Sequence, residues 1–217
     1  MDYHLDLYNL ELIYQSRNEV YRGTLKADPT KTVIFKYDSD YIGLESSLLQ
    51  HLQGKVANIS TLLHYEAGEI TSPSSKMFKQ LHVFAEIQGT ILIGPRSKEI
   101  MKDCITSSNN ICITDIPIDR RRQLIIDLIQ IIIECHKHGV IYGDGFCNNV
   151  IITKDWTPYL IDFGNGFFKD NAPKFLDHSA PESMDIFCLL ELMKCALSIE
   201  FPSEWKHLKA KDVLALL

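Results

Sequence analysis

Short apolar or β-branched runs separated by polar turns fill the first third of the chain. The runs lie at Leu10–Tyr14, Val20–Leu25, Thr32–Tyr37, Ile59–Tyr65 and Leu81–Ile87. Turn-forming residues stand between them, such as Ala27-Asp28-Pro29. Runs of this length, bounded by turn signals, predict β-strands. We therefore expect a small sheet in this part of the chain.

Apolar residues recur at the spacing of a helix once within this first part of the chain and again after residue 119. Apolar residues recur at helical spacing across Tyr41–Leu52, and Gly54 ends the pattern. Arg120–His138 carries an almost continuous apolar face that is closed by Gly139. Its isoleucines would also suit a buried strand, but the segment is too long for one. We therefore expect a helix at each of these two places.

The remainder of the chain alternates brief apolar runs with polar loops before a last helix. The runs, which predict short strands, lie at Val140–Tyr142, Val150–Thr153 and Tyr159–Ile161. The sequence Ser179-Ala180-Pro181-Glu182 combines an S-x-x-E capping box with a proline near a helix start. We therefore expect the last helix to begin near Ser179. The whole pattern predicts an α+β protein with a small sheet lobe and a helical lobe.

Composition and charge exclude several classes of protein. The 217 residues are 46% hydrophobic and 23% charged, as in an ordinary globular protein, with a net charge of −6. A net negative charge argues against nucleic acid as the main partner. The longest apolar stretch, Leu124–Ile133, is too short to span a bilayer, so no membrane association is expected. Six cysteines without a CxxC pair indicate free thiols. We expect an intracellular protein, cytoplasmic or nuclear.

The residues best suited to chemistry lie between 138 and 164. Asp144 stands in a polar loop after a predicted strand, and Asn149 follows five positions later. Asp162-Phe163-Gly164 ends the next strand. Two carboxylates and a carboxamide on loops form a cluster of hard oxygen ligands. Mg²⁺ prefers such ligands and leaves its other positions to water and phosphate oxygens.

These motifs resemble those of the protein-kinase-like superfamily. Its catalytic loop has Asp-x4-Asn, matched by Asp144 and Asn149, and its metal loop is Asp-Phe-Gly, matched at Asp162. Upstream, Lys36 in Val-Ile-Phe-Lys resembles the strand lysine, and Glu45 its helical ion-pair partner. The resemblance implies a bilobal kinase-like fold, with an N-lobe of one sheet and one helix at 1–88. A shortened helical C-lobe would occupy 89–217.

Three further positions extend the resemblance. Val20 resembles the strand residue that follows the nucleotide loop, and Glu86 lies in the segment that resembles the hinge between lobes. Asp185 resembles the acidic residue of the central C-lobe helix that pins the catalytic loop. Alternatively, Asp185 only favours a helix N-terminus electrostatically.

The resemblance implies a role for each matched residue. Asp144 would accept or orient the proton of the acceptor hydroxyl. Lys36, positioned by Glu45, would hold the α- and β-phosphates of ATP, while Asn149 and Asp162 would bind Mg²⁺. Val20 and Glu86 would line the nucleotide site. Together these residues imply transfer of the γ-phosphate to a hydroxyl acceptor, with a protein as the expected substrate or partner.

Departures from the family pattern leave a second function open. The segment Tyr14–Val20, where a glycine-rich loop is expected, contains no glycine, and Phe146 stands where Ser/Thr kinases have a lysine. A glycine before Asp144 resembles the compact atypical members of the superfamily, of the small Bud32-like type. Ala180-Pro181-Glu182 also spells the family's A-P-E, but Asp185 follows too soon, so the capping box is preferred. The alternative to a kinase is a pseudokinase, a nucleotide- or protein-binding module that transfers little phosphate.

Overall fold

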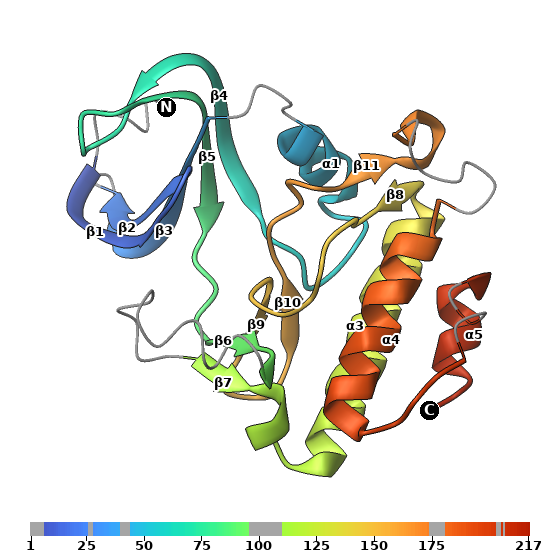
Figure 1. Ribbon diagram of the computed structural model, residues 1–217. Coiled ribbons are helices and arrows are strands. Elements are labelled where there is room, and N and C mark those ends of the chain that lie inside the picture. Colours follow the sequence, from blue (N-terminus) through green and yellow to red (C-terminus); the bar gives the residue numbers. More distant parts are fainter. Residues whose placement is uncertain are drawn as a thin grey trace.

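The chain forms an α+β structure in which an antiparallel sheet lies beside a helical part (Figure 1). The computed structural model describes residues 7–25, 28–39, 44–95, 110–173, 181–202, 205 and 207–217. The first part consists of β1 (Leu7–Gln15), β2 (Glu19–Leu25), β3 (Asp28–Asp38), α1 (Leu44–Leu52), β4 (Leu62–Thr71) and β5 (Met77–Ala85). Its five strands pair antiparallel in the order β1-β2-β3-β5-β4. The predicted small sheet with one helix is therefore present.

The second part is built on two long helices and short strands. Its elements are β6 (Thr90–Ile93), β7 (Asn110–Cys112), η2 (Ile113–Asp115), α3 (Ile118–Lys137), β8 (Val140–Ile141), β9 (Val150–Ile152), β10 (Pro158–Leu160), β11 (Phe167–Phe168), η3 (Lys169–Asn171), α4 (Ser183–Leu197) and α5 (Ala210–Leu214). The strands form a four-stranded sheet, β10-β9-β6-β7, and the pair β11-β8. In Figure 1, α4 lies along α3, and α5 lies to one side of them.

Two predicted strand boundaries are wrong because the chain pairs differently there. The strand predicted at 59–65 begins only at Leu62, since the preceding residues contact the second part instead. Ser60 N donates to Leu160 O at 3.0 Å, and Leu160 N donates to Asn58 O at 2.9 Å. The strand predicted at 81–87 runs from Met77 to Ala85, because its pairing with β4 continues to the hairpin turn.

The prediction for the last helix is also wrong, because the predicted helix, α4, starts later than expected and a short helix that was not predicted, α5, follows it. Helix α4 begins at Ser183, and its N-cap residue is Glu182, which makes no capping hydrogen bond with its side chain. The Glu182 carboxylate instead binds Lys169 Nζ and lies 3.7 Å from His136 Nδ1. Lys169 and the buried His136 contact different oxygens of this carboxylate, which therefore points to them and not to the backbone of the helix start. Ser179 itself lies outside the described residues.

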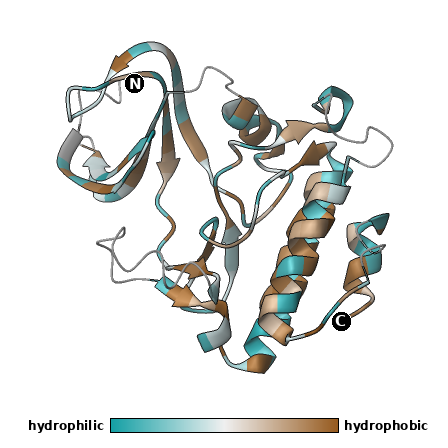
Figure 2. Ribbon diagram, in the orientation of Figure 1, coloured by the Kyte–Doolittle hydropathy of each residue, from teal (hydrophilic) through white to brown (hydrophobic). Residues whose placement is uncertain are grey.

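Two hydrophobic clusters stabilise the molecule. The larger one contains the apolar faces of α1, α3 and α4, and it continues into β9 and β10. The smaller one lies on the five-stranded sheet and contains Tyr21, Phe35, Tyr37 and Phe78. Figure 2 shows the alternation of hydrophobic and hydrophilic residues along α3 and α4 that this burial requires. Phe84 of β5 belongs to the larger cluster, so the sheet is packed directly against the second part.

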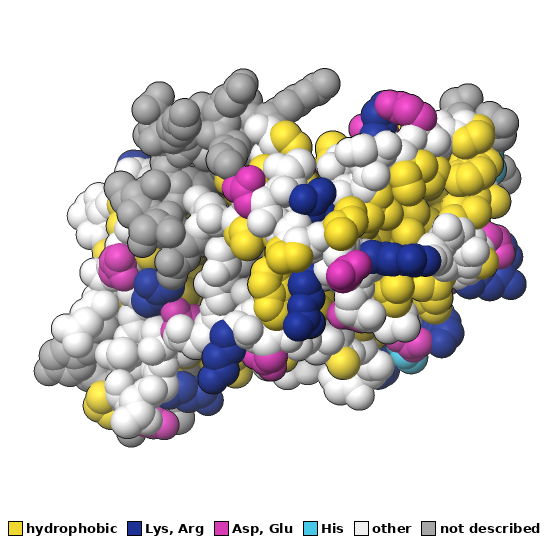
Figure 3. Space-filling view, turned by 90° about the horizontal axis from the view of Figure 1, so that it is seen from below, with side chains coloured by type: hydrophobic (Ala, Val, Ile, Leu, Met, Phe, Trp, Pro, Cys, Tyr) yellow, Lys and Arg dark blue, Asp and Glu magenta, His cyan; other side chains and the backbone are white. Residues whose placement is uncertain are grey.

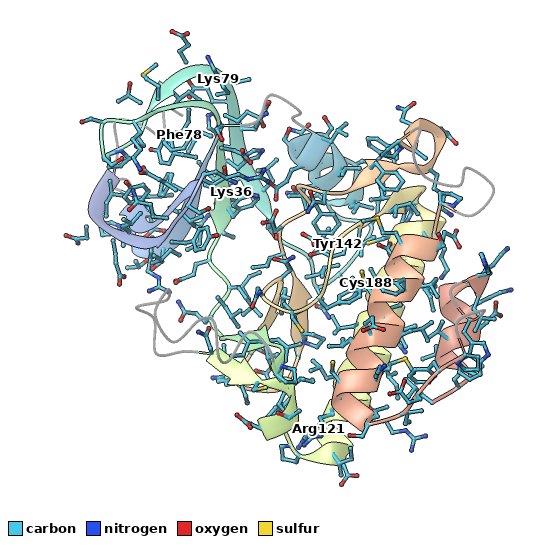
Figure 4. The ribbon with its side chains drawn as sticks, viewed as in Figure 1. Lys36, Phe78, Lys79, Arg121, Tyr142 and Cys188 are labelled. Carbon is cyan, nitrogen blue, oxygen red and sulfur yellow. The ribbon has the colours of Figure 1, made fainter. Side chains whose placement is uncertain are left out.

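An arginine joins the lower ends of α3 and α4 (Figure 4). Arg121 donates to Ala196 O of α4 at 2.9 Å, and to Ile116 O and Thr114 O at 2.5 Å each. These bonds satisfy carbonyl groups at a helix C-terminus and in the η2 segment, which have no helical partner. The register between the two helices is thereby fixed at this end.

Hydrophobic side chains also reach the surface of the helical part. Seen from below, they gather on one half of the face, with lysine and arginine side chains between them (Figure 3). Exposed examples in this part are Ile118, Ile199 and Leu216. Among the described residues, no helix is both long and apolar enough to cross a membrane.

Candidate functional site

Lys36 of β3 joins two carboxylates that lie far from it in the sequence. Its Nζ is 2.7 Å from Glu45 Oε2 on α1 and 2.8 Å from Asp162 Oδ1. Lys36 is 8% exposed and Glu45 is 3% exposed. Burial alone would lower the pKa of Lys36, but attraction to Glu45 and Asp162 outweighs burial and raises it above its ordinary value. The structure therefore holds a charged amine on the side of the sheet that faces α1 (Figure 4).

The Asp162-Phe163-Gly164 segment is fixed by its own backbone and by Glu45. Asp162 has φ 58°, a left-handed conformation that costs a non-glycine residue about 1–2 kcal/mol. Its Oδ1 also accepts a bond from Gly164 N at 3.1 Å. Burial would raise the pKa of Asp162, but Lys36 lowers it overall. Glu45 Oε1 accepts a bond from Phe163 N at 3.1 Å, so α1 contacts this segment directly through Glu45 and β3 contacts it through Lys36.

Asp144 and Asn149 form the second half of the site. Asp144 Oδ1 accepts a bond from Gly145 N at 2.7 Å, and Oδ2 accepts one from Asn149 Nδ2 at 3.1 Å. The Asn149 carbonyl accepts a bond from Ile161 N at 2.9 Å, one residue before Asp162. The five polar residues that the motifs indicated thus form two groups, Lys36–Glu45–Asp162 and Asp144–Asn149, and the backbone bond between Asn149 and Ile161 connects their loops.

A buried aspartate on α4 holds the loop that carries Asp144. Asp185 is fully buried, and its Oδ1 accepts a bond from Gly143 N at 2.7 Å. Its Oδ2 accepts one from Tyr142 N at 2.9 Å and lies 2.8 Å from His136 Nε2. Asp185 was predicted either to hold the Asp144 loop or only to favour a helix N-terminus electrostatically. The geometry agrees with the first interpretation. An isolated electrostatic effect at the helix start would not require these three contacts.

Of the other two predicted positions, Val20 lies beside Lys36, whereas Glu86 contacts none of the five motif residues among the described interactions and lines a cavity that contains none of them. Val20 of β2 is the cross-strand neighbour of Lys36, so both side chains lie on the same face of the sheet. Glu86 follows β5 and binds Arg22 Nε at 2.6 Å and Gln88 Nε2. Its carboxylate is therefore an ion-pair partner of β2. Glu86 also lines a cavity of about 720 Å³, together with residues 87–90 and the turn at 153–155.

A further buried carboxylate, Glu19, was not predicted from the sequence. It is fully buried at the start of β2 and accepts bonds from Tyr21, Ser72 and Ser74, with Lys76 Nζ 3.1 Å away. Burial alone would raise the pKa of Glu19, but these donors outweigh it and lower the pKa to about 2. The glycine-free turn between β1 and β2 is thus anchored to the β4–β5 hairpin. Only the serine-rich hairpin gave any signal of such a contact.

Comparison with known proteins assigns no family to this chain. No family model matches it, and no curated protein matches its sequence. The chemistry of the site must therefore be inferred from its residues and geometry.

His82 makes the site region sensitive to acid. It is 1% exposed, it is the cross-strand neighbour of Lys36, and its ring stacks on Phe84 at 5.9 Å. Within the described residues, neither ring nitrogen has a hydrogen-bond partner of ordinary geometry, and the Lys36 backbone favours the protonated ring only weakly. Burial, and next to it the charge of Lys36, lowers the pKa of His82 from 6.5 to about 4. The buried imidazole is therefore neutral at pH 7.

This depressed pKa predicts a loss of stability in acid. The unfolded chain binds a proton at His82 below pH 6.5, whereas the folded chain does so only near pH 4. The contribution of His82 to the free energy of unfolding is therefore fully present above pH 6.5. It is lost as the pH falls towards 4, and the whole loss is about 3 kcal/mol. Urea denaturation between pH 4 and 7.5 measures it. His82→Phe should flatten this part of the profile, whereas the exposed His207→Gln should not; equal slopes in all three proteins would contradict the prediction.

Proposed function

We propose that this chain is an ATP- and Mg²⁺-dependent phosphotransferase of the compact, atypical protein-kinase-like type. The observation that carries the proposal is the contact of Lys36 with both Glu45 and Asp162. Positions 36 and 162 are 126 residues apart, and each was selected from sequence by a different motif. A charged amine beside a carboxylate, next to a second carboxylate–carboxamide pair, suits a triphosphate and its metal ion.

The residues present fit Mg²⁺ and a nucleotide. Asn149 and Asp162 supply hard oxygen ligands from neighbouring backbones, as the bond between Asn149 O and Ile161 N requires. The Asn149 amide nitrogen binds both Asp144 and Gly145 O, which orients the amide oxygen away from Asp144. The Lys36 amine is suited to phosphate oxygens because attraction to its two carboxylate partners keeps it charged. Bound Mg²⁺–ATP would supply the phosphoryl group and neutralise the charge that develops on it.

The roles of the chain's own groups follow from this arrangement. Lys36 orients the α- and β-phosphates, and Glu45 holds the amine in place through a 2.7 Å contact. Asp144 takes the proton of the attacking hydroxyl as the hydroxyl oxygen bonds to the γ-phosphorus and ADP leaves. Asp185 keeps the Asp144 loop in register by binding two of its backbone N–H groups.

Two observations favour a pseudokinase as the second candidate. Phe146 is 2% exposed and stacks on Tyr142 at 5.7 Å, so the loop places an apolar ring where Ser/Thr kinases have a phosphate-binding lysine. The turn between β1 and β2 has side chains instead of glycines, which reduces close backbone approach to phosphate. A pseudokinase would bind nucleotide and transfer little phosphate.

A thermal-shift titration with ATP, with and without Mg²⁺, tests nucleotide binding for both candidates. A ligand that binds only the folded state at 100 times its Kd adds about 2.7 kcal/mol, or roughly 5–10 °C in Tm for a chain of this size. We expect millimolar Mg²⁺–ATP to raise the Tm of the wild type, and Lys36→Met to abolish the shift. Lys31→Met, at an exposed position of the same strand, is the matched control and should retain it. Absence of a shift in the wild type would contradict the phosphotransferase and a nucleotide-binding pseudokinase, but not a pseudokinase that only binds protein.

A further inference from the structure

Asp144 has a hydrogen-bond partner that the motifs did not indicate. Asn165 Nδ2 donates to Asp144 Oδ2 at 2.9 Å, from the segment that follows Asp162-Phe163-Gly164. The same oxygen accepts the Asn149 amide at 3.1 Å, and the other carboxylate oxygen accepts Gly145 N. Asn149 and Gly145 belong to the same loop as Asp144, whereas Asn165 reaches it from 21 residues away. It therefore links the proposed metal-binding segment to the proposed catalytic carboxylate.

The fold holds Asn165 against this loop by several independent contacts. The short strands β8 and β11 pair Ile141 with Phe167, which brings the chain before Asp144 next to the chain after Asn165. Gly166 N donates to Phe163 O at 3.0 Å and closes the turn that contains Asn165. Gly143 has φ 75°, and a Cβ there would lie 2.5 Å from the Asn165 carbonyl oxygen. A glycine at 143 is thus needed for the two segments to approach this closely.

The chemistry of proton transfer gives this contact a role. A general base needs its carboxylate in one orientation, with an oxygen lone pair directed at the hydroxyl. Donors from three sides fix the Asp144 side chain: a backbone N–H from its own loop, one amide from the same loop and one from the facing segment. Asn165 is exposed, so its amide contributes little packing to the core. Its strongest described interaction is the bond to Asp144.

We propose that Asn165 is a positioning residue for phosphoryl transfer: it orients the Asp144 carboxylate towards the acceptor hydroxyl and couples that orientation to the Asp162 segment. This inference rests on the proposed function, because it assigns Asn165 to the same reaction. It adds a residue outside the Asp-x4-Asn and Asp-Phe-Gly motifs. Substitution of Asn165 should therefore slow the chemical step and leave nucleotide binding unchanged, since Asn165 contacts neither Lys36 nor Glu45 among the described interactions.

The test measures release of inorganic phosphate from Mg²⁺–ATP, and labelling of the chain itself, at saturating nucleotide. Asn165→Ala is expected to lower kcat about tenfold, the effect of about 1.4 kcal/mol in the transition state, with the KM for ATP and the Tm unchanged. Asn165→Asp should lower kcat further, because a second carboxylate repels Asp144 and offers no amide donor. Asn171→Ala replaces another exposed asparagine of the same segment and should behave as the wild type.

A double-substitution experiment separates positioning from a merely structural role. In an Asp144→Ala background, Asn165→Ala should cause no further loss of rate, since it acts only through Asp144. An Asn165→Ala protein with wild-type kcat, or an equal loss in both backgrounds, would overturn the inference. A wild-type protein that neither releases phosphate nor labels itself overturns the proposed function instead, so the two failures are distinguishable.

Discussion

Replacement of Asp185 by alanine is expected to lower the free energy of unfolding by about 3–5 kcal/mol. The fully buried carboxylate accepts bonds from Tyr142 N and Gly143 N and pairs with His136. Alanine leaves these donors buried without a partner, and each unsatisfied group costs about 1–3 kcal/mol. Because Gly143 immediately precedes Asp144, the same substitution should release the loop of the candidate site. Urea denaturation monitored by circular dichroism measures the loss.

Two further variants control this experiment. Asp185→Asn keeps one acceptor oxygen and should lose an intermediate amount of stability. Glu191→Ala lies on the same helix at an exposed position, and surface changes of this kind stay within about 0.5 kcal/mol. If Asp185→Ala were as stable as Glu191→Ala, the loop would not depend on this carboxylate.

The second large effect is expected at Asp144. Under the proposed function, Asp144→Ala should lower the rate of phosphoryl transfer about 10²–10⁴-fold, the range that a positioned general base contributes. Nucleotide binding should persist, because Lys36, Glu45 and Asp162 contact one another without Asp144. Transfer of label from the γ-phosphate of ATP to the chain, followed together with the thermal shift by Mg²⁺–ATP, measures both properties.

The matched control for this substitution is Asp119→Ala. Asp119 is an exposed aspartate in the first turn of α3, outside the network around Lys36 and outside the cavity beside Glu86, and its loss should leave the rate unchanged. Equal rates for the wild type and Asp144→Ala would remove the catalytic role from this carboxylate. Nucleotide binding without transfer in the wild type would instead favour the pseudokinase.

The fold could be predicted from the sequence where elements are long. The apolar runs around Val20–Leu25 and Thr32–Tyr37 and the helix at Arg120–His138 correspond to β2, β3 and α3 with small changes at their ends. Strands β6, β7 and β11 were not predicted, although β8, β9 and β10 are no longer than these and were indicated by their apolar runs. Their pairing depends on the segments that pack beside them.

The candidate site divides in the same way. Its five motif residues were chosen because they match motifs of the protein-kinase-like superfamily, and the structure places Lys36 against Glu45 and Asp162, and Asp144 against Asn149. Glu19 and Asn165 could not be found from the sequence. A glutamate in a strand and an asparagine in a loop are usually surface residues, and nothing in their local sequence indicates otherwise. Burial of Glu19 results from the β4–β5 hairpin folding over β2, and the reach of Asn165 results from β8–β11 pairing.

By itself, the order of amino acids determined where most of the longer strands and helices form, and which side chains are chemically suited to phosphate and metal. Only the tertiary structure decided which distant groups form hydrogen bonds: Lys36 with Asp162, Gly143 N with the buried Asp185, and Asn165 with Asp144. The reason is physical. Conformational preference and periodicity act over a few neighbouring residues, whereas burial and hydrogen bonds between distant segments depend on how the completed elements pack.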